Sequence, residues 1–262
     1  MKSSPSADLP TIPAAPNRLG ELIVAYGLVR PAVWAAFHTV WLASDGPLPH
    51  PADGPLIFYM NHPGWWDGYM AYLLHHELFG RRVEGYLMME EAQLSAFRFF
   101  AWCGAFSVDR HSPRSAERSV RYIAALLRQR RSRALWILPQ GMIVPPDRRP
   151  IALFPGTAWV AQRAGGALLV PVAMRYEFGA EQQPEVFVRL GEPHRAAAGV
   201  DRKQLSADVT DRLTATLDRL RDDVVLGRTG DYRPLLRGRV GIDKLTGSLG
   251  RWLARRISKG AR

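Results

Sequence analysis

Short apolar runs alternate with longer amphipathic stretches between about residue 55 and residue 225. Short runs that are β-branched or aromatic and bounded by turn residues predict buried strands, and apolar residues at helical spacing predict helices. The expected strands are 55–60, 84–89, 105–108, 135–138, 168–174 and 186–190. The expected helices are 68–79, 92–102, 113–130, 155–164 and 205–225. This alternation predicts an α/β fold, with a mixed, largely parallel sheet that carries helices on both faces.

The first 45 residues do not follow this alternation. Residues 1–16 are rich in Ser, Pro and Ala and predict a disordered N-terminus. Residues 17–45 are largely apolar but are interrupted by charged residues and by Pro31, so they predict a short helical pair at the membrane interface rather than a membrane span. Three aromatic side chains would lie at that interface or pack onto the domain: Trp34, Phe37 and Trp41.

Much of the formal net charge of +11 lies in the last segment, residues 227–262. Within it, residues 249–259 place apolar side chains at helical intervals with basic residues between them. This pattern is typical of an amphipathic helix on an anionic membrane surface, and a solvated basic tail is the alternative. The expected organisation is therefore a disordered N-terminus, an interfacial segment, one domain over 46–226 and a basic amphipathic tail.

Composition narrows the chemistry. A strongly basic chain needs an anionic partner such as a membrane surface, nucleic acid or an acidic carrier, but no nucleic-acid-binding motif is present, so no nucleic acid is expected. The single cysteine, Cys103, excludes an internal disulfide and a multi-cysteine metal site, and it reads as a small buried residue rather than a nucleophile. His75, His76 and Glu77 diverge around a helix, so no metal is expected either.

The clearest chemical pattern follows the predicted strand 55–60. His62 and Asp67 would point roughly 140° apart on one continuous helix, so they can pair only across a bend. Pro63 and Gly64 supply that bend. An Asp in this position would accept a hydrogen bond from one imidazole nitrogen and leave the other as a general base. The alternative is a histidine that only caps a strand end.

Two further strand ends carry candidate binding residues. Arg110 lies between the strand 105–108 and a long helix, where its guanidinium and the free helix amides suit an anion; a surface ion pair with Asp109 is the alternative. Gln140 and Gly141 follow the strand 135–138, and a glycine there lets backbone amides approach a ligand closely.

In order and spacing, these residues resemble the glycerolipid acyltransferases of the lysophosphatidate acyltransferase type, over about residues 20–195. The first motif of that family, N-H-x4-D, is matched by Asn61, His62 and Asp67. Matches to G-x-[apolar]-x-[apolar]-D-R, in part to F-P-E-G-T-R, to V-P-V and to G-[E/K]-P follow in chain order, at 104–110, 138–141, 170–172 and 191–193.

The resemblance implies an O-acyltransferase that moves a fatty acyl group from acyl-CoA or acyl-carrier protein to a hydroxyl of a lipid in phospholipid biosynthesis. His62 would be the general base, oriented by Asp67, without a covalent enzyme intermediate, cofactor or metal. Amides near Gly141 would stabilise the oxyanion, and Trp65 and Trp66 would line an acyl channel or belong to the core. The implied location is the cytoplasmic face of the membrane, peripheral or monotopic. The alternative is an inactive protein of the same fold that holds lipid or a partner at the membrane.

The third motif departs from the family in a way that bears on the acceptor. The resemblance implies that a Glu and an Arg help to hold a glycerol phosphate there, but this chain has Gln140 and Ile143. An apolar side chain cannot bind phosphate. Arg110, Arg148 and Arg149 remain candidates for substrate binding, and the expected acceptor has a less charged head group.

Overall fold

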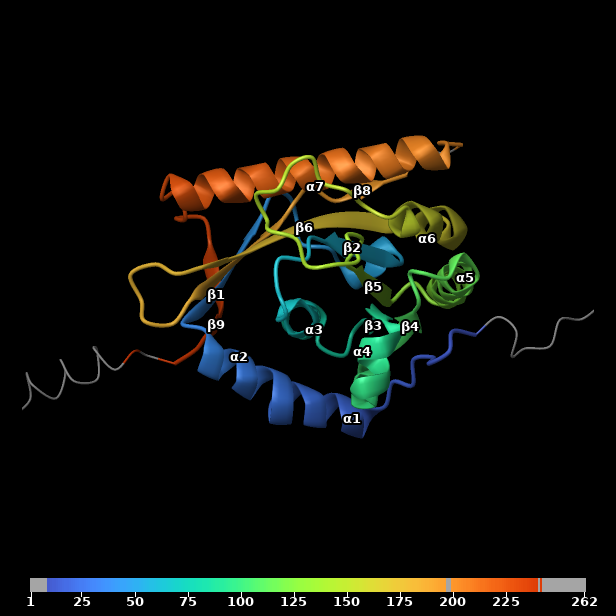
Figure 1. The fold of residues 1–262 in the computed structure, drawn as a ribbon, viewed down its shortest axis with the longest axis horizontal. Helices are drawn as coiled ribbons and strands as arrows, with labels where there is room; N and C mark the ends of the chain where they lie inside the picture. The colour runs from blue at the N-terminus through green and yellow to red at the C-terminus, as the bar shows by residue number, and fades with distance from the viewer. Residues whose placement is uncertain (1–8, 197–198, 240, 242–262) are drawn as a thin grey trace, which may run out of the picture.

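The structure, a computed structural model, describes residues 9–196, 199–239 and 241. Its strands form one sheet in the order β4-β3-β5-β2-β6-β7-β1-β9, with β8 beside β6 (Figure 1). The strands are β1 (Thr39–Ser44), β2 (Leu56–Met60), β3 (Glu84–Glu90), β4 (Ala105–Val108), β5 (Arg133–Ile137), β6 (Leu168–Glu177), β7 (Glu185–Leu190), β8 (His194–Arg195) and β9 (Arg233–Arg237).

Strand directions make the sheet mixed and largely parallel, as the sequence predicted. Neighbouring strands from β4 through β3, β5 and β2 to β6 are parallel. β7 is antiparallel to β6, β1 is parallel to β7, and β9 is antiparallel to β1. The carboxyl ends of five parallel strands therefore meet at one edge, which is where α/β folds build their sites.

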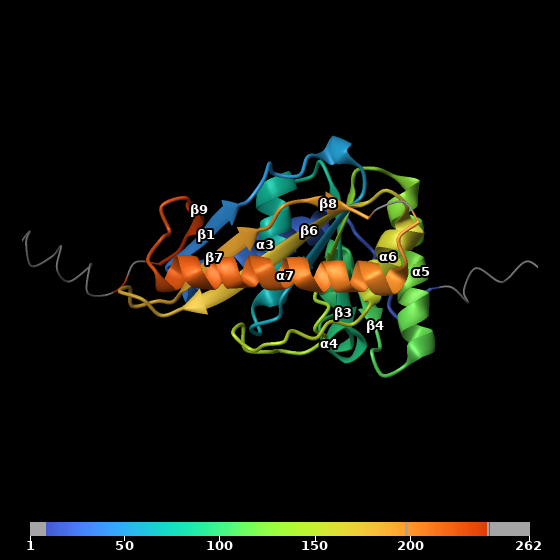
Figure 2. The same ribbon diagram turned by 90° about the horizontal axis from the view of Figure 1, so that it is seen from above.

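Helices cover both faces of the sheet, which confirms the predicted layers (Figures 1 and 2). The central strand β2 shows why: Leu56, Phe58 and Met60 belong to one apolar cluster, whereas Ile57 and Tyr59 belong to the other. The first cluster includes α3 and the N-terminal helix, and the second includes α5, α6 and α7. The helices are α1 (Arg18–Leu22), η2 (Ile23–Val29), α2 (Arg30–Ala36), η3 (Pro51–Asp53), α3 (Asp67–Phe79), α4 (Glu91–Ala96), η4 (Arg98–Cys103), α5 (Pro113–Gln129), α6 (Gly156–Ala164) and α7 (Arg202–Val225).

The predicted pair of N-terminal helices is wrong, because α1, η2 and α2 form one continuous helix from Arg18 to Ala36. Its middle part, η2, is a π-helix, and the Arg30 N–H donates to the Ala25 carbonyl across a five-residue step. Pro31 follows directly inside this continuous helix, where it has no N–H to donate, and the wider π-helical turn lies just before it. Among the described residues, this is the one helix long and apolar enough to cross a membrane, and length and composition alone do not establish that it does.

For two of the three aromatic residues, the structure favours the alternative that they pack onto the domain. Phe37 is buried in the core. Trp41 lies in β1 and donates its indole N–H to Glu185 at 2.8 Å. Trp34 is about half exposed and stays a candidate for the interface.

Both ends of the chain contribute more to the domain than the sequence suggested. Ile12, in the segment expected to be disordered, is buried and donates its N–H to the Ser107 hydroxyl at 2.9 Å. β1 lies inside the expected interfacial segment and β9 inside the expected tail, yet the two strands pair in the sheet. Residues 1–8 and the basic stretch 249–259 lie outside the described residues. The helix expected over 92–102 is divided into α4 and η4 at Phe97, whose backbone is not helical.

Candidate active site

The turn between β2 and α3 brings together the two residues that the sequence marks as a pair. The chain leaves β2, bends through Pro63 and Gly64, and enters α3 at Asp67. Nδ1 of His62 lies 2.5 Å from Oδ2 of Asp67. The expected pairing across a bend is therefore present, at the carboxyl edge of the sheet.

Asp67 is fully buried and accepts three hydrogen bonds. Oδ2 accepts from His62 and, at 3.0 Å, from the Gly64 N–H, while Oδ1 accepts from the Tyr176 hydroxyl at 2.5 Å. A buried carboxylate is costly unless it is hydrogen-bonded, so these bonds fix its position. Burial, followed by the nearby Asp67 carboxylate, raises the pKa of Tyr176, which keeps the phenol protonated as a donor.

Sequence analysis missed Tyr176 as part of this site. It lies 109 residues after Asp67 and belongs to β6, and only the parallel pairing of β2 with β6 brings the two together. The apolar and aromatic character of β6 indicated a core strand but gave no signal for this contact.

His62 is oriented so that one ring nitrogen stays open. A carboxylate can only accept a hydrogen bond, so Nδ1 carries the proton and Nε2 presents its lone pair. The side chain is 21% exposed, and Nε2 makes no hydrogen bond with the described residues. Such a nitrogen is suited to take a proton from a hydroxyl.

Backbone contacts fix the position of His62 itself. The Asn61 side chain bonds both backbone groups of Met174, donating to its carbonyl at 2.9 Å and accepting from its N–H at 2.8 Å. The His62 N–H donates to Oε1 of Gln140 at 2.6 Å, and its carbonyl accepts from the Val144 N–H at 2.8 Å. Gln140 therefore supports the candidate base from a buried position, a role that sequence reasoning did not anticipate.

Gly141 shapes the turn after β5. Its φ is +66°, and a Cβ there would lie 2.7 Å from the Phe154 ring, so both the conformation and the space call for glycine. Its N–H donates to the Leu138 carbonyl at 3.1 Å. That amide is therefore occupied, which argues against Gly141 itself as the donor to an oxyanion.

Arg110 lies at the same edge, because β4 and β5 end there together. Its guanidinium donates to the Gly141 carbonyl, and its Nε lies 3.3 Å from the Glu90 carboxylate. The ion pair considered with Asp109 is replaced by these contacts: an Asp109 carboxylate oxygen accepts from the backbone of His111 instead. Arg110 thus lies beside the third motif, and its guanidinium already contacts the Gly141 carbonyl and the Glu90 carboxylate.

The loop between Gly141 and α6 holds the other candidate arginines. Arg149 pairs with Asp218 of α7 at 2.6 Å, and Asp147 pairs with Arg175 of β6 at 2.5 Å. Arg148 is exposed. The structure therefore uses Arg149 to fasten the loop to α7 and does not bring it to His62.

Apolar side chains, rather than cations, project from the segment after Gly141. Met142, Ile143 and Phe154 are each more than half exposed. Trp65, in the turn after His62, is 61% exposed, whereas Trp66 packs against the core with its ring centroid 5.2 Å from that of Phe37. Trp66 is thus a core residue, and the edge of the site has an apolar rim.

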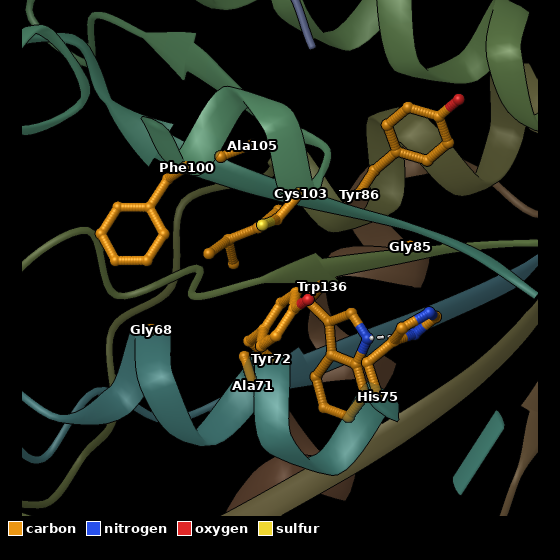
Figure 3. A pocket seen from close by; sticks show the side chains of 11 residues that line it. Gly68, Ala71, Tyr72, His75, Gly85, Tyr86, Phe100, Cys103, Ala105 and Trp136 are labelled. Atoms are coloured by element: carbon orange, nitrogen blue, oxygen red, sulfur yellow. Dashed lines mark hydrogen bonds between the residues drawn. The ribbon is translucent and has the colours of Figure 1, made fainter. Parts of the chain in front are cut away.

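An apolar cavity lies between α3 and β3, beside the first turn of α3 (Figure 3). Gly68, next to Asp67, lines it together with Ala71 and Tyr72. A Cβ at Gly68 would meet nothing within 4 Å, so the cavity is open at the end that Gly68 lines. The floor is closed by Trp136, whose indole N–H donates to Nδ1 of His75 at 3.2 Å. Neither Trp65 nor Trp66 lines this cavity.

Cys103 also lines the cavity, and burial raises the pKa of its thiol to about 12. A thiol in that state is a poor nucleophile. Within the described residues no group of three or more His, Cys, Asp or Glu side chains is placed to hold a metal ion. At this edge the His62–Asp67 pair has the geometry of a group that can accept a proton.

The comparison with family models agrees with the motifs. The Acyltransferase family model matches residues 43–175, just over half of the chain. No curated protein matches. Among solved structures, the chain is similar to the 1-acyl-sn-glycerophosphate acyltransferase PlsC of Thermotoga maritima, with 14% identity, a TM-score of 0.49, and coverage of 69% of this chain and 72% of that one. The family match spans the turn with His62 and Asp67, Arg110, Gly141 and most of β6, and the chain belongs to the acyltransferase family.

Proposed function

We propose that this protein transfers a fatty acyl group from a thioester, acyl-CoA or acyl-carrier protein, to a hydroxyl of a lipid acceptor. One observation carries the proposal: a buried, triply hydrogen-bonded Asp67 holds His62 with Nε2 open at the carboxyl edge of the sheet. The acceptor oxygen bonds to the thioester carbonyl carbon while its proton passes to Nε2. The C–S bond then breaks, and the imidazolium returns the proton to the leaving thiolate.

No nucleophilic side chain is needed in this mechanism, and the raised pKa of Cys103 is consistent with that. General base catalysis contributes about 10²- to 10⁴-fold, so the rest of the acceleration comes from holding thioester and hydroxyl in line. The apolar cavity beside Gly68 has a volume of about 20 Å³, room for little more than one water molecule, so the acyl chain of the donor lies outside it in this proposal.

The acceptor in this proposal is a hydroxylated lipid with little charge on its head group. Gln140 is occupied by the His62 N–H, Ile143 is exposed and apolar, and Arg149 is paired with Asp218. Each charge-assisted bond to a phosphate contributes about 1.5–3 kcal/mol, so the loss of one weakens a phosphate acceptor by about tenfold or more. An uncharged glycolipid-like acceptor avoids that loss.

Membrane attachment is the second part of the proposal. The N-terminal helix exposes the apolar side chains of Leu19, Leu22, Ile23, Tyr26 and Trp34. The same helix buries Val24, Val29 and Val33 in the core. A helix with one face packed on the domain can lie along the interface but cannot cross the bilayer without leaving the core. We therefore propose a peripheral or monotopic enzyme on the cytoplasmic face.

Transfer of labelled acyl groups from acyl-CoA and from acyl-carrier protein to a panel of lipids tests the activity. His62→Ala should lower transfer by about 10²- to 10⁴-fold, whereas His50→Ala, which removes an exposed histidine at the start of η3, should leave it unchanged. Absence of transfer to every acceptor by the unaltered enzyme would favour the alternative of an inactive lipid-holding protein. A clear preference for lysophosphatidate that is lost in Arg148→Ala or Arg149→Ala would show that these arginines form the phosphate site. The proposal of an acceptor with little charge would then be wrong.

A further inference from the structure

A second cleft opens at the far end of α3 from the candidate active site. It is lined by the N-terminal helix, the end of α3 and the turns that precede β3 and β5. α3 has 13 residues and rises 1.5 Å per residue, so about 20 Å separates its two ends. The first of these ends carries Asp67, and the second borders the cleft.

Four arginines from three separate parts of the chain line this cleft: Arg18, Arg81, Arg82 and Arg130. Arg82 closes the end of α3, donating to the carbonyls of Phe79 at 3.1 Å and Leu78 at 2.9 Å. The other three side chains are exposed, and they make no hydrogen bond or ion pair with any residue that the structure describes: Arg18, Arg81 and Arg130. Their guanidinium groups are therefore available to a ligand.

The acidic residues of the cleft do not cancel this charge. Glu84 is already bound by Arg133, at 2.8 Å. Burial raises the pKa of Glu21, although the positive charge of Arg81 acts in the opposite direction. The neutral form of this carboxyl is therefore more favoured than that of an exposed one. The cleft thus retains a net positive charge that suits an anion.

One wall of the cleft is apolar. Leu22 and Tyr26 of the N-terminal helix line it and are 45% and 55% exposed. They continue into the exposed stripe that includes Leu19 and Ile23. A ligand that fits both walls carries an anionic group and, beside it, a hydrocarbon chain.

We propose that this cleft binds the head group of an anionic phospholipid, with its phosphate among Arg18, Arg81 and Arg130 and its acyl chains along Leu22 and Tyr26. The site is separate from the acceptor site, because the length of α3 lies between them. A free phosphate would not use the apolar wall, and the phosphates of CoA would not be accompanied by hydrocarbon there. Binding does not depend on acyl transfer, so the proposal stands apart from the catalytic one.

Isothermal titration of the full-length protein with dihexanoylphosphatidylglycerol, kept below its micelle concentration, tests the site without a membrane. We expect saturable binding of one lipid per chain. Arg81→Gln/Arg130→Gln should raise the dissociation constant by about tenfold or more, because each cation near an anionic group raises the affinity by about fivefold. The matched control, Lys203→Gln/Arg228→Gln, removes two exposed cations beside the ends of α7, on the other face of the sheet, and should change binding by less than twofold.

Three further titrations separate the possible ligands. His62→Ala should bind the lipid unchanged, since the catalytic site is not involved. Leu22→Gln should weaken the binding of the lipid but leave the binding of inorganic phosphate unchanged. Inorganic phosphate or CoA binding as tightly as the lipid, with the same loss in Arg81→Gln/Arg130→Gln, would overturn the proposal in favour of a general anion site or a donor site. No saturable binding, or equal losses in the double variant and its control, would overturn it as well.

Discussion

Tyr176→Phe is the most informative single substitution at the candidate site, because it removes one oxygen and keeps the ring. The Tyr176 hydroxyl is the one described partner of Oδ1 of Asp67, at 2.5 Å, and Asp67 is fully buried. A hydrogen bond to a charged group contributes about 1.5–3 kcal/mol. We expect the free energy of unfolding to fall by that amount and turnover to fall about tenfold, since a looser Asp67 holds His62 less firmly.

Urea unfolding and acyl transfer assays on the same preparations measure both effects. Tyr122→Phe is the matched control: its hydroxyl accepts from the neutral Ala14 N–H at 3.2 Å, so stability should fall by only about 0.5–1.5 kcal/mol and turnover should not change. In an Asp67→Asn background, Tyr176→Phe should cost only about 0.5–1.5 kcal/mol, because the acceptor is then neutral. Unchanged stability together with unchanged turnover in Tyr176→Phe would refute the reasoning.

Four further outcomes are expected. His62→Ala and Asp67→Ala should each lower turnover by about 10²- to 10⁴-fold with circular dichroism unchanged, and undiminished turnover of purified His62→Ala would exclude the mechanism. Ile143→Arg should raise turnover on lysophosphatidate by about tenfold if a missing cation limits it, as measured against an uncharged acceptor. Burial lowers the pKa of His75 from 6.5 to about 4, so between these pH values the unfolded chain binds a proton that the folded chain does not. The free energy of unfolding, measured with urea, should therefore fall by up to about 1.4 kcal/mol per pH unit from pH 6.5 towards pH 4. Deletion of residues 251–262 should weaken flotation with anionic vesicles at low salt, and no change at low or high salt would make the tail a solvated extension.

Local patterns were enough to predict the middle of the fold. β2 and α3 were expected close to their observed bounds, because a short β-branched and aromatic run, a Pro-Gly turn and a helical period follow one another there. β1 and β9 were not expected, since β1 continues an apolar segment that reads as helical and β9 is a five-residue strand that contains Pro234. What places these strands is the pairing of β1 with β7 and β9, contacts between residues far apart in the sequence.

The candidate site divides in the same way. The His62–Asp67 pair spans five residues and could be deduced from the turn between them. Tyr176 and the support that Gln140 gives to His62 depend on how β6 and β5 align with β2, which no short window of sequence contains. Arg149 was expected at the substrate because it is close in sequence to the third motif, but in the structure its guanidinium pairs with Asp218 of α7, which comes from a distant part of the chain.

The position of β1 determines how the chain can be shortened. Residues 18–36 look like a detachable apolar anchor, but the strand that follows them fills the space between β7 and β9. Removal of the first 45 residues would leave the backbones of both neighbours unpaired, and exposed strand edges promote aggregation. Even a cut after Ala36, which spares β1, would strip Val24, Val29 and Val33 from the apolar layer over α3. A soluble form of this protein is better sought by placing polar side chains on the outer stripe of the helix than by cutting the helix away.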